Sequence, residues 1–351
     1  MSEVSAPPRI ALVTGSVPPA PCGVGDYTAH LAAGLADLGL DVQIVSGTRW
    51  GIFEYRRLAD RLNALRPDIV HIQYPTIGYG LGLAPQTLAM LYSPAPVVVT
   101  VHEFTLAHPL RKLAVLAFAP RSALLIFVSD HERSAYVRAS PAARHKSEVV
   151  KLASNIPFVN SGSRDEYRVV YFGRIAPRKG LEDFLHAARL AEGRRMPFQF
   201  EVIGTPDPGQ LAYFTRLRDG SRDIPVVWTL GRPPEEVAAL LATATYAYLP
   251  FPDGASERRA SLLAALGNGA LVLTTRGVYT PDELTGVTIF VKSPSAAVDQ
   301  LNDMSGRADE RRRLSDSAVQ YARRFSWPEV ARQHLALYRG VWATAPRSGY
   351  G

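Results

Sequence analysis

Short apolar runs alternate with segments of helical periodicity along the whole chain. In the first half, each run is almost continuously apolar, as expected for strands of a parallel sheet that are buried on both faces. Helical segments separate the runs, which is typical of doubly wound α/β domains. The expected strands are 10–13, 42–45, 69–73, 97–101 and 124–128, and the expected helices are 27–38, 55–65, 85–91, 110–118 and 131–138.

A polar stretch at 160–166 interrupts this alternation, which then starts again. We therefore predict an N-terminal domain at 1–163 and a C-terminal domain at 164–326, followed by an amphipathic helix within 327–351. The second domain is expected to contain strands at 169–172, 200–203, 226–230, 246–249, 271–274 and 287–291, and helices at 181–191, 210–218, 234–242 and 258–266.

Length and composition agree with two globular domains. The chain has 351 residues, of which 47% are hydrophobic and 20% are charged. Cys22 is the only cysteine, which excludes an internal disulfide and is typical of a reducing compartment. There is no signal-peptide pattern and no apolar run of the ~20 residues that a membrane span needs. We therefore expect a cytoplasmic protein.

The net charge of +7 favours anionic partners. However, lysine supplies only five of the 39 basic residues, and such heavy use of arginine is typical of GC-rich coding. The chain has no basic tail and no run of Lys and Arg interleaved with aromatic residues, so we do not expect nucleic-acid binding.

A glycine-rich segment at 14–28 follows the first expected strand. Ligands of doubly wound sheets bind beyond the carboxyl ends of the strands. Gly23 and Gly25 allow close approach of the backbone, and the following helix start offers free N–H groups to an anion. Asp26 is either the N-cap of that helix or a side chain facing an acceptor hydroxyl. An ordinary turn explains the segment equally well, and no G-x-G-x-x-G dinucleotide motif is present.

A second loop, at 171–181, follows the first strand of the C-terminal domain. Arg174 comes directly after Gly173, and Lys179 precedes a helix expected to start at Gly180. A forked guanidinium and a compact ammonium at a helix N-terminus are groups that bind a diphosphate. The alternative is that both are solvated loop charges, as we expect for Arg178.

This loop resembles the G-R-x-x-x-x-K-G signature of the family 4 glycosyltransferases, which have the GT-B fold. Further segments resemble that family in the same order along almost the whole chain. They are 23–28, 68–74, 100–102, 127–129, 198–204, 227–231 and 325–327. The resemblance implies two Rossmann-like domains that face each other across a cleft, with the acceptor on the N-terminal side and the donor on the C-terminal side. It also implies a last helix that crosses back onto the N-terminal domain.

The resemblance also implies residue roles. Arg174 and Lys179 would bind the donor diphosphate and stabilise the departing charge, and His102 would lie near the donor sugar. A buried structural histidine is the alternative for His102, and we expect His71 to be structural. The other donor contacts would come from Gly23, Gly25, Gly173, Gly204, Gly231 and Arg232, and the acceptor contacts from Asp26, Tyr27 and Tyr74.

The chain departs from the family at the paired glutamates that precede an Ala-x-x-x-Gly stretch. Ser256 and Ala264 occupy these two positions, and Glu257 lies one residue from the first. Arg258 and Arg259 open the expected helix, where cations are unfavourable unless an anion is nearby. Either they are solvated, or one of them meets a phosphate or an acidic group. The residues expected to bind the donor here are Ser256, Glu257, Arg258 and Ser261.

The resemblance, together with the cations at 174 and 179, therefore implies a retaining glycosyltransferase that needs no metal and uses a nucleotide-diphosphate sugar. The acceptor is not identified and could be a saccharide, a lipid or a small natural product, and peripheral contact with a membrane stays open. One alternative is a catalytically weakened sugar-nucleotide-binding subunit. Another is an inverting GT-B enzyme or an epimerase, with Asp26 or His102 as the base.

Overall fold

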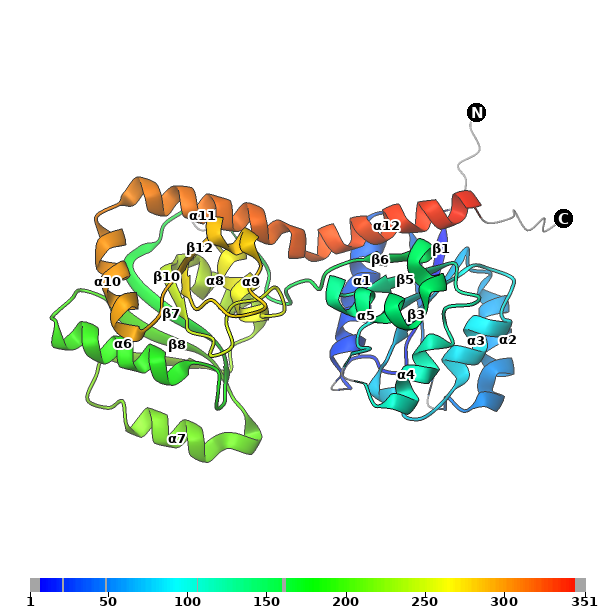
Figure 1. Cartoon of the computed structure of the whole chain (residues 1–351), viewed down its shortest axis with the longest axis horizontal. Coiled ribbons are helices and arrows are strands. Elements are labelled where there is room, and N and C mark those ends of the chain that lie inside the picture. The colour runs from blue at the N-terminus through cyan, green and yellow to red at the C-terminus, as the bar shows by residue number, and fades with distance from the viewer. Residues whose placement is uncertain (1–6, 21, 48, 106, 160–161, 345–351) are drawn as a thin grey trace. The chain divides into compact units, whose positions relative to one another are not determined.

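The computed structural model describes residues 7–20, 22–47, 49–105, 107–159 and 162–344. The chain divides into two compact units (Figure 1). Unit 1 comprises Met1–Leu152 together with Trp327–Gly351, and unit 2 comprises Ala153–Ser326. None of the described helices is long and apolar enough to cross a membrane.

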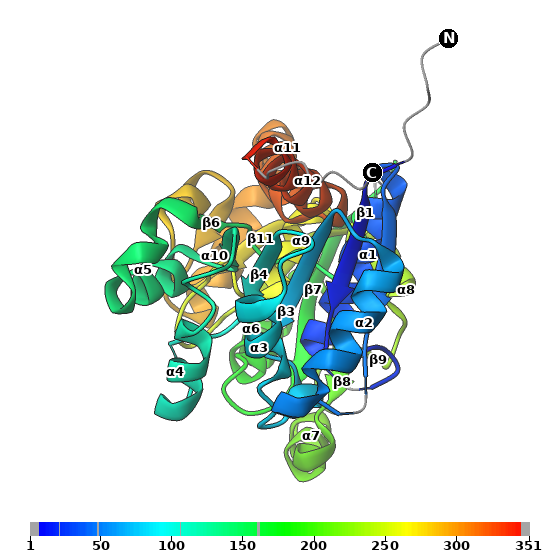
Figure 2. The ribbon, with the colours of Figure 1, turned by 90° about the vertical axis from the view of Figure 1, so that its right-hand side faces the viewer.

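Unit 1 is built on a sheet of six parallel strands in the order β2-β1-β3-β4-β5-β6. Strands β1, β3 and β4 lie side by side in Figure 2. All carboxyl ends of parallel strands meet at one edge of the sheet, so the loops that follow them share that edge. The strands are β1 (Arg9–Val13), β2 (Asp41–Val45), β3 (Ile69–Tyr74), β4 (Val97–Val101), β5 (Leu124–Phe127) and β6 (Ser147–Val149).

Helices cover both faces of this sheet. Ala11 and Val13 of β1 belong to one buried cluster with side chains of the α2 and α3 helices. Because side chains alternate along a strand, the equally buried Ile10 and Leu12 point to the opposite face. The helices are α1 (Gly23–Asp37), α2 (Tyr55–Leu65), α3 (Ala84–Leu91), α4 (Pro109–Leu116), α5 (Asp130–Ala139) and α12 (Trp327–Thr344), with short 3₁₀ helices η1 (Ile52–Glu54), η2 (Ile77–Tyr79) and η3 (Pro141–Lys146).

Helix α12 joins unit 1 by packing along α1. A Cβ atom placed on Gly34 of α1 would lie only 2.9 Å from the Cβ of Ala331 of α12. The absence of a side chain at Gly34 therefore sets how closely the two helices approach.

Unit 2 repeats the architecture with six parallel strands in the order β12-β11-β10-β7-β8-β9. The strands are β7 (Asp165–Ile175), β8 (Gln199–Pro206), β9 (Val226–Leu230), β10 (Ala244–Leu249), β11 (Leu271–Thr274) and β12 (Thr288–Phe290). The helices are α6 (Leu181–Gly193), α7 (Leu211–Asp219), α8 (Pro234–Thr243), α9 (Ala260–Gly267), α10 (Pro294–Ser305) and α11 (Ala308–Ala322), with 3₁₀ helices η4 (Pro208–Gln210), η5 (Asp282–Gly286) and η6 (Arg323–Phe325).

The register of β7 and β8 positions the candidate site. Gly173 pairs with Gly204 and Arg174 pairs with Thr205 at the carboxyl ends of the two strands. A Cβ atom on Gly204 would lie 2.1 Å from the carbonyl oxygen of Gly173. Glycine at this position is therefore required for the two strands to pair.

The two doubly wound parallel sheets are as predicted, but several boundaries differ. Helix α1 begins at Gly23, so Asp26 lies inside its first turn and is not its N-cap. Helix α9 begins at Ala260, so Arg258 and Arg259 precede the helix and do not open it. Positions 160 and 161 of the expected interdomain stretch lie outside the described residues. The division into acceptor and donor domains stays a prediction.

Candidate functional site

A pocket of about 640 Å³ opens at the carboxyl ends of β7 and β8 in unit 2, within the size range of small-molecule sites. It brings together residues that lie far apart in the sequence. Seven of the predicted site residues line it: Gly173, Arg174, Lys179, Gly204, Arg232, Arg258 and Ser261.

The charges on the pocket wall are mostly positive. Five lining side chains are cationic, and Asp207 is the only carboxylate among the described lining residues. Asp207 lies 3.4 Å from the guanidinium of Arg174, whose side chain is 71% exposed. An ion pair this long and this exposed is weak, so it leaves Arg174 available for a ligand that carries more negative charge than a carboxylate.

Lys179 is held at the start of α6 by the loop backbone. The hydroxyl of Tyr171 donates a hydrogen bond to the carbonyl oxygen of Lys179 at 3.0 Å. Gly180, the N-cap of α6, has a φ of 84° and would meet Pro250 if it carried a side chain. The ammonium of Lys179 is half-buried and has no hydrogen bond or ion pair within the described part of the chain. A cation beside the unpaired N–H groups of a helix start is suited to an anion.

Another wall of the pocket lies just before α9. The guanidinium of Arg259 pairs with Asp253 and lies 4.9 Å from the centre of the Phe251 ring. Its side chain is only 19% exposed, so Arg259 is not the solvated charge that one interpretation expected. Arg258 lines the pocket beside it.

Five residues predicted to bind the donor do not line this pocket: Gly23 and Gly25 of unit 1, and Gly231, Ser256 and Glu257 of unit 2. The carboxylate of Glu257 instead accepts a hydrogen bond of 2.9 Å from the hydroxyl of Tyr321 on α11. The carbonyl of Ser256 accepts a hydrogen bond from the backbone N–H of Arg259. In this structure, Glu257 therefore does not replace the missing glutamate inside the pocket.

The glycine-rich loop of unit 1 packs against its own neighbours. A Cβ atom on Gly25 would lie 2.9 Å from the carbonyl oxygen of Ser16, whereas Gly23 is exposed with open space around it. The Ser16 hydroxyl accepts a hydrogen bond from the N–H of Gly78 at 2.9 Å. The close approach that Gly25 permits is thus to backbone of this loop, and a role toward the donor stays a prediction.

His102 of unit 1 belongs to a hydrogen-bonded chain of side chains. Its Nε2 lies 2.9 Å from Oε1 of Gln73, and Nε2 of Gln73 lies 3.2 Å from Nε2 of His71. Because an amide oxygen only accepts, His102 must carry its proton on Nε2. Nδ1 of His102 is then an acceptor, and it has no partner among the described residues. The sequence places His71 and Gln73 on one strand face at a spacing of two, but their link to His102 was not predicted.

This series of hydrogen bonds continues to the C-terminal helix, α12. Nδ1 of His71 lies 2.5 Å from the hydroxyl of Tyr338, and Thr100 lies 2.7 Å from Nε2 of His71. His71 is fully buried, in agreement with a structural role. On the other side of His102, the Tyr27 ring meets it edge-on at 4.7 Å, and the Tyr27 hydroxyl lies 3.5 Å from Nε2 of His334.

The surroundings keep His102 neutral. Burial, together with the nearby His334, lowers the pKa of His102 to about 3. Burial also lowers the pKa of His334 to about 4. A general base is most effective when its pKa is near the working pH, so His102 is better suited to accept a hydrogen bond than to remove a proton.

The two tyrosines predicted to bind the acceptor are buried. Tyr27 and Tyr74 are each 5% exposed. The Tyr74 ring packs between Tyr79 and Phe118, with ring centres 5.7 and 5.1 Å away. These rings therefore serve the core of unit 1, and of the predicted acceptor residues only Asp26 is partly exposed.

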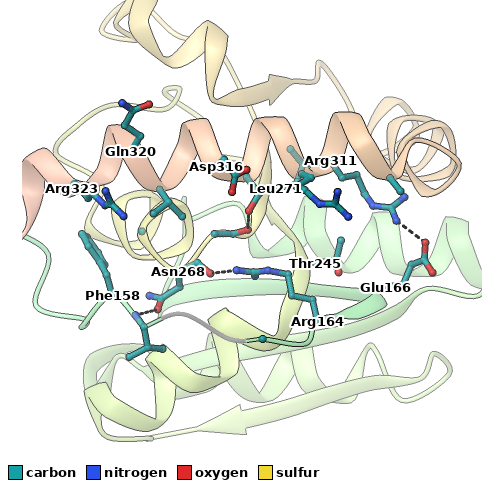
Figure 3. A pocket seen from close by; sticks show the side chains of 18 residues that line it. Phe158, Arg164, Glu166, Thr245, Asn268, Leu271, Arg311, Asp316, Gln320 and Arg323 are labelled. Atoms are coloured by element: carbon teal, nitrogen blue, oxygen red, sulfur yellow. Dashed lines mark hydrogen bonds and ion pairs between the residues drawn. The ribbon is translucent and has the colours of Figure 1, made fainter.

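A larger cavity of about 910 Å³ lies at the other end of the unit 2 strands (Figure 3). Most of its arginines form ion pairs or hydrogen bonds with other groups of the protein. Arg311 binds the carboxylate of Glu166 at 2.6 Å, and Arg164 donates to the carbonyls of Ala244 and Asn268. Ligands of doubly wound sheets bind at carboxyl ends of strands, so the smaller pocket is the better candidate despite its size.

Comparison with known proteins agrees with the sequence resemblance. Residues 46–153 match the model described as Glycosyltransferase Family 4. Two D-inositol 3-phosphate glycosyltransferases, from Corynebacterium urealyticum and Corynebacterium kroppenstedtii, are 26% and 25% identical over 60% and 51% of this chain. These matches cover 50% and 41% of the relatives, so the chain spans about half the length of the curated relatives it matches.

Solved glycosyltransferase structures share the fold. A glycosyltransferase from Rickettsia africae superimposes with a TM-score of 0.73 at 13% identity, over 97% of this chain and 100% of that one. Sucrose-phosphate synthase from Thermosynechococcus elongatus gives 0.66 at 16% identity, over 96% and 100%. Anabaena HepE, in complex with UDP and glucose, gives 0.64 at 16% identity, over 95% and 99%. The expected GT-B fold and the resemblance to family 4 are therefore confirmed, while the roles of individual residues stay predictions.

Proposed function

We propose that the chain is a glycosyltransferase that moves a sugar from a nucleotide-diphosphate donor, bound in the unit 2 pocket, to an acceptor hydroxyl. The observation that carries the proposal is the half-buried ammonium of Lys179, which faces the pocket without a partner among the described residues. Arg174 stands beside it with only a weak ion pair. The two cations and the start of α6 are the groups that a diphosphate needs.

The same groups would serve the chemical step. When the bond between the anomeric carbon and the diphosphate breaks, negative charge develops on the departing oxygen. Arg174, Lys179 and the N–H groups of α6 would stabilise that charge, which is the largest contribution in many enzymes. This positive charge is supplied by the protein itself, in keeping with a reaction that needs no metal.

The proton accounting favours retention of configuration. The acceptor oxygen would bond to the anomeric carbon on the face that the diphosphate leaves, and its proton would pass to a departing phosphate oxygen. Inversion would instead need a protein base. The pKa of His102, lowered to about 3, makes it a poor base at neutral pH, so Asp26 is the remaining candidate for an inverting reaction. His102 would contribute its Nδ1 as a hydrogen-bond acceptor.

The comparisons suggest which nucleotide sugar and which acceptor to test first. Because HepE has been solved with UDP and with UDP-glucose, UDP-glucose is the first donor to test. The D-inositol 3-phosphate glycosyltransferases make inositol phosphates an acceptor class to include.

A second candidate function is a sugar-nucleotide-binding subunit with little turnover of its own. One observation favours it: Glu257 binds Tyr321 and is not part of the pocket wall, so the pocket has no carboxylate at the position of the missing glutamates. A charged hydrogen bond of this kind contributes about 1.5–3 kcal/mol.

The test compares the double variant Arg174→Ala/Lys179→Ala with the wild type by calorimetry with UDP and by donor hydrolysis. We expect the affinity for UDP to fall by at least about a hundredfold, because two charged hydrogen bonds are lost. Arg178→Ala, which removes an adjacent exposed cation, is the matched control and should bind like the wild type. Unchanged affinity in the double variant would reject the proposed site, and binding without turnover in the wild type would favour the subunit.

A further inference from the structure

Five large apolar side chains are exposed in the loops that follow β2 and β3 in unit 1. Phe53 and Leu81 are each 93% exposed, so the remainder of unit 1 hardly covers them. Scattered exposed apolar residues are normal, but a contiguous group of them marks an interaction site. We call this group the apolar rim; it consists of Ile52, Phe53, Ile77, Leu81 and Leu83, with exposures of 51%, 93%, 74%, 93% and 44%.

The two loops that carry the apolar rim are joined through Trp50. The N–H of Ala84 donates a hydrogen bond to the carbonyl oxygen of Trp50 at 3.0 Å. The ring of Trp50 meets that of Tyr79 edge-on, with the centres 4.6 Å apart. Helix α3 also contacts η1. The apolar residues of both loops therefore lie on one part of the surface.

The apolar rim lies at the same sheet edge as the glycine-rich loop. The N–H of Gly78, next to Ile77, binds the hydroxyl of Ser16, which precedes α1 in that loop. This edge also holds Asp26, the partly exposed residue predicted to contact the acceptor. Whatever covers the apolar rim is thus brought to the edge of unit 1 where we expect the acceptor.

Cations flank the apolar rim. Arg49, Arg56 and Arg57 are all exposed and lie within four residues of Phe53 in the chain. Glu54 offsets one of them, through a pair with Arg57 at 3.5 Å. Protruding apolar side chains with an excess of arginine nearby are the combination that binds the interface of an anionic bilayer.

We propose that the apolar rim docks unit 1 on a membrane surface rich in anionic lipid, with Phe53 and Leu81 inserted among the lipids and the arginines on the headgroups. Nearly complete exposure of two side chains suits insertion better than a flat contact with another protein. It follows that the acceptor is amphiphilic and is presented from that surface. This last step rests on the proposed function, whereas docking does not.

The test is flotation of the full-length protein with vesicles, without any sugar nucleotide. We expect binding to vesicles that contain phosphatidylglycerol and little binding to pure phosphatidylcholine. The double variant Phe53→Ser/Leu81→Ser should lose at least about tenfold in vesicle affinity, since two large apolar anchors are removed. Both positions are exposed, and circular dichroism checks that the variant folds.

The matched control is Val278→Ser/Tyr279→Ser, which removes two other side chains, 93% and 79% exposed, from unit 2. It should bind vesicles like the wild type. Failure of the wild type to bind, or equal loss in both double variants, would overturn the proposal. So would a dimer in solution that Phe53→Ser/Leu81→Ser dissociates, because the apolar rim would then be covered by a second copy. UDP calorimetry of the same samples tests the proposed function separately.

Discussion

At the residue scale, two histidines on neighbouring strands have different surroundings: His71 lies on β3, and His102 directly follows β4. His71 uses both ring nitrogens within the protein, to Tyr338 and Thr100. His102 uses one nitrogen, on Gln73, and keeps the other free within the described part of the chain. Gln73 thereby fixes which nitrogen of His102 carries the proton. We expect Gln73 to act as a positioning residue for His102.

Replacing Gln73 with leucine tests this expectation. The Nε2–H of His102 would lose its acceptor, and an unpaired buried donor costs about 1–3 kcal/mol. We predict that kcat falls about ten- to hundredfold, while the affinity for UDP is unchanged because the proposed donor pocket lies in unit 2. Nitrogen NMR should show the Nε2–H form of His102 in the wild type and a mixture in Gln73→Leu.

Gln43→Leu is the control for the loss of an amide, since Gln43 is exposed and its side chain bonds only its near neighbour Asp41 among the described residues. It should leave kcat unchanged. A Gln73→Leu protein with normal kcat, or one whose affinity for UDP falls in parallel with kcat, would contradict the positioning role.

The sequence predicted which residues lie together where they are close along the chain or on adjacent strands. Gly173, Arg174 and Lys179 occur within one loop, and Gly204 ends the next strand, so parallel pairing alone brings them together. Glu257 was harder to place, because its partner Tyr321 lies on a helix that the sequence pattern did not predict. The partners of His71 and Tyr27 on α12 were missed although that helix was predicted, because they lie 267 and 307 residues away along the chain.

At the element scale, the strands were easier to predict than the helices near the end of unit 2. Buried parallel strands are continuous apolar runs, and such runs stand out in the sequence. Helix α11 (Ala308–Ala322) is largely polar and was not predicted, and α10 was missed as well. The short edge strand β6 has only one apolar residue, Val149, so no pattern marked it.

The contact between α1 and α12 leads to an element-scale prediction. Because a Cβ atom on Gly34 would lie 2.9 Å from that of Ala331, Gly34→Val must push the two helices apart. Overpacking of this kind costs about 1–3 kcal/mol, which we expect as a lower free energy of unfolding in urea.

Gly23→Ala is the control on the same helix. Gly23 has open space around it, so alanine there should be neutral or slightly stabilising through its higher helix propensity. Equal stability of Gly34→Val and the wild type would show that α12 does not pack on α1 in solution.

At the scale of the whole molecule, the buried histidines should make the stability depend on pH. The pKa values of His102 and His334 are lowered to about 3 and about 4, and that of His71 is also well below its usual range. The unfolded chain therefore takes up protons that the folded chain does not as the pH falls below about 6.5. The contribution of these histidines to the free energy of unfolding is therefore fully present above that pH and decreases as the pH falls toward 4.

For each such histidine, the free energy of unfolding should fall by up to about 1.4 kcal/mol per pH unit in this window. Urea titrations at pH 7, 6 and 5 measure the slope. His334→Gln should reduce it by the contribution of one group. A stability that is flat between pH 7 and pH 5 would mean that the histidines titrate normally and are not held neutral.

The central claim about the whole molecule is that a diphosphate binds at the start of α6. A crystal structure of the protein with UDP tests it most directly. We predict density for both phosphates within hydrogen-bonding distance of the Lys179 ammonium and the first N–H groups of α6, with Arg174 turned from Asp207 toward them. Diphosphate density elsewhere, with Lys179 still unpartnered, would contradict the claim.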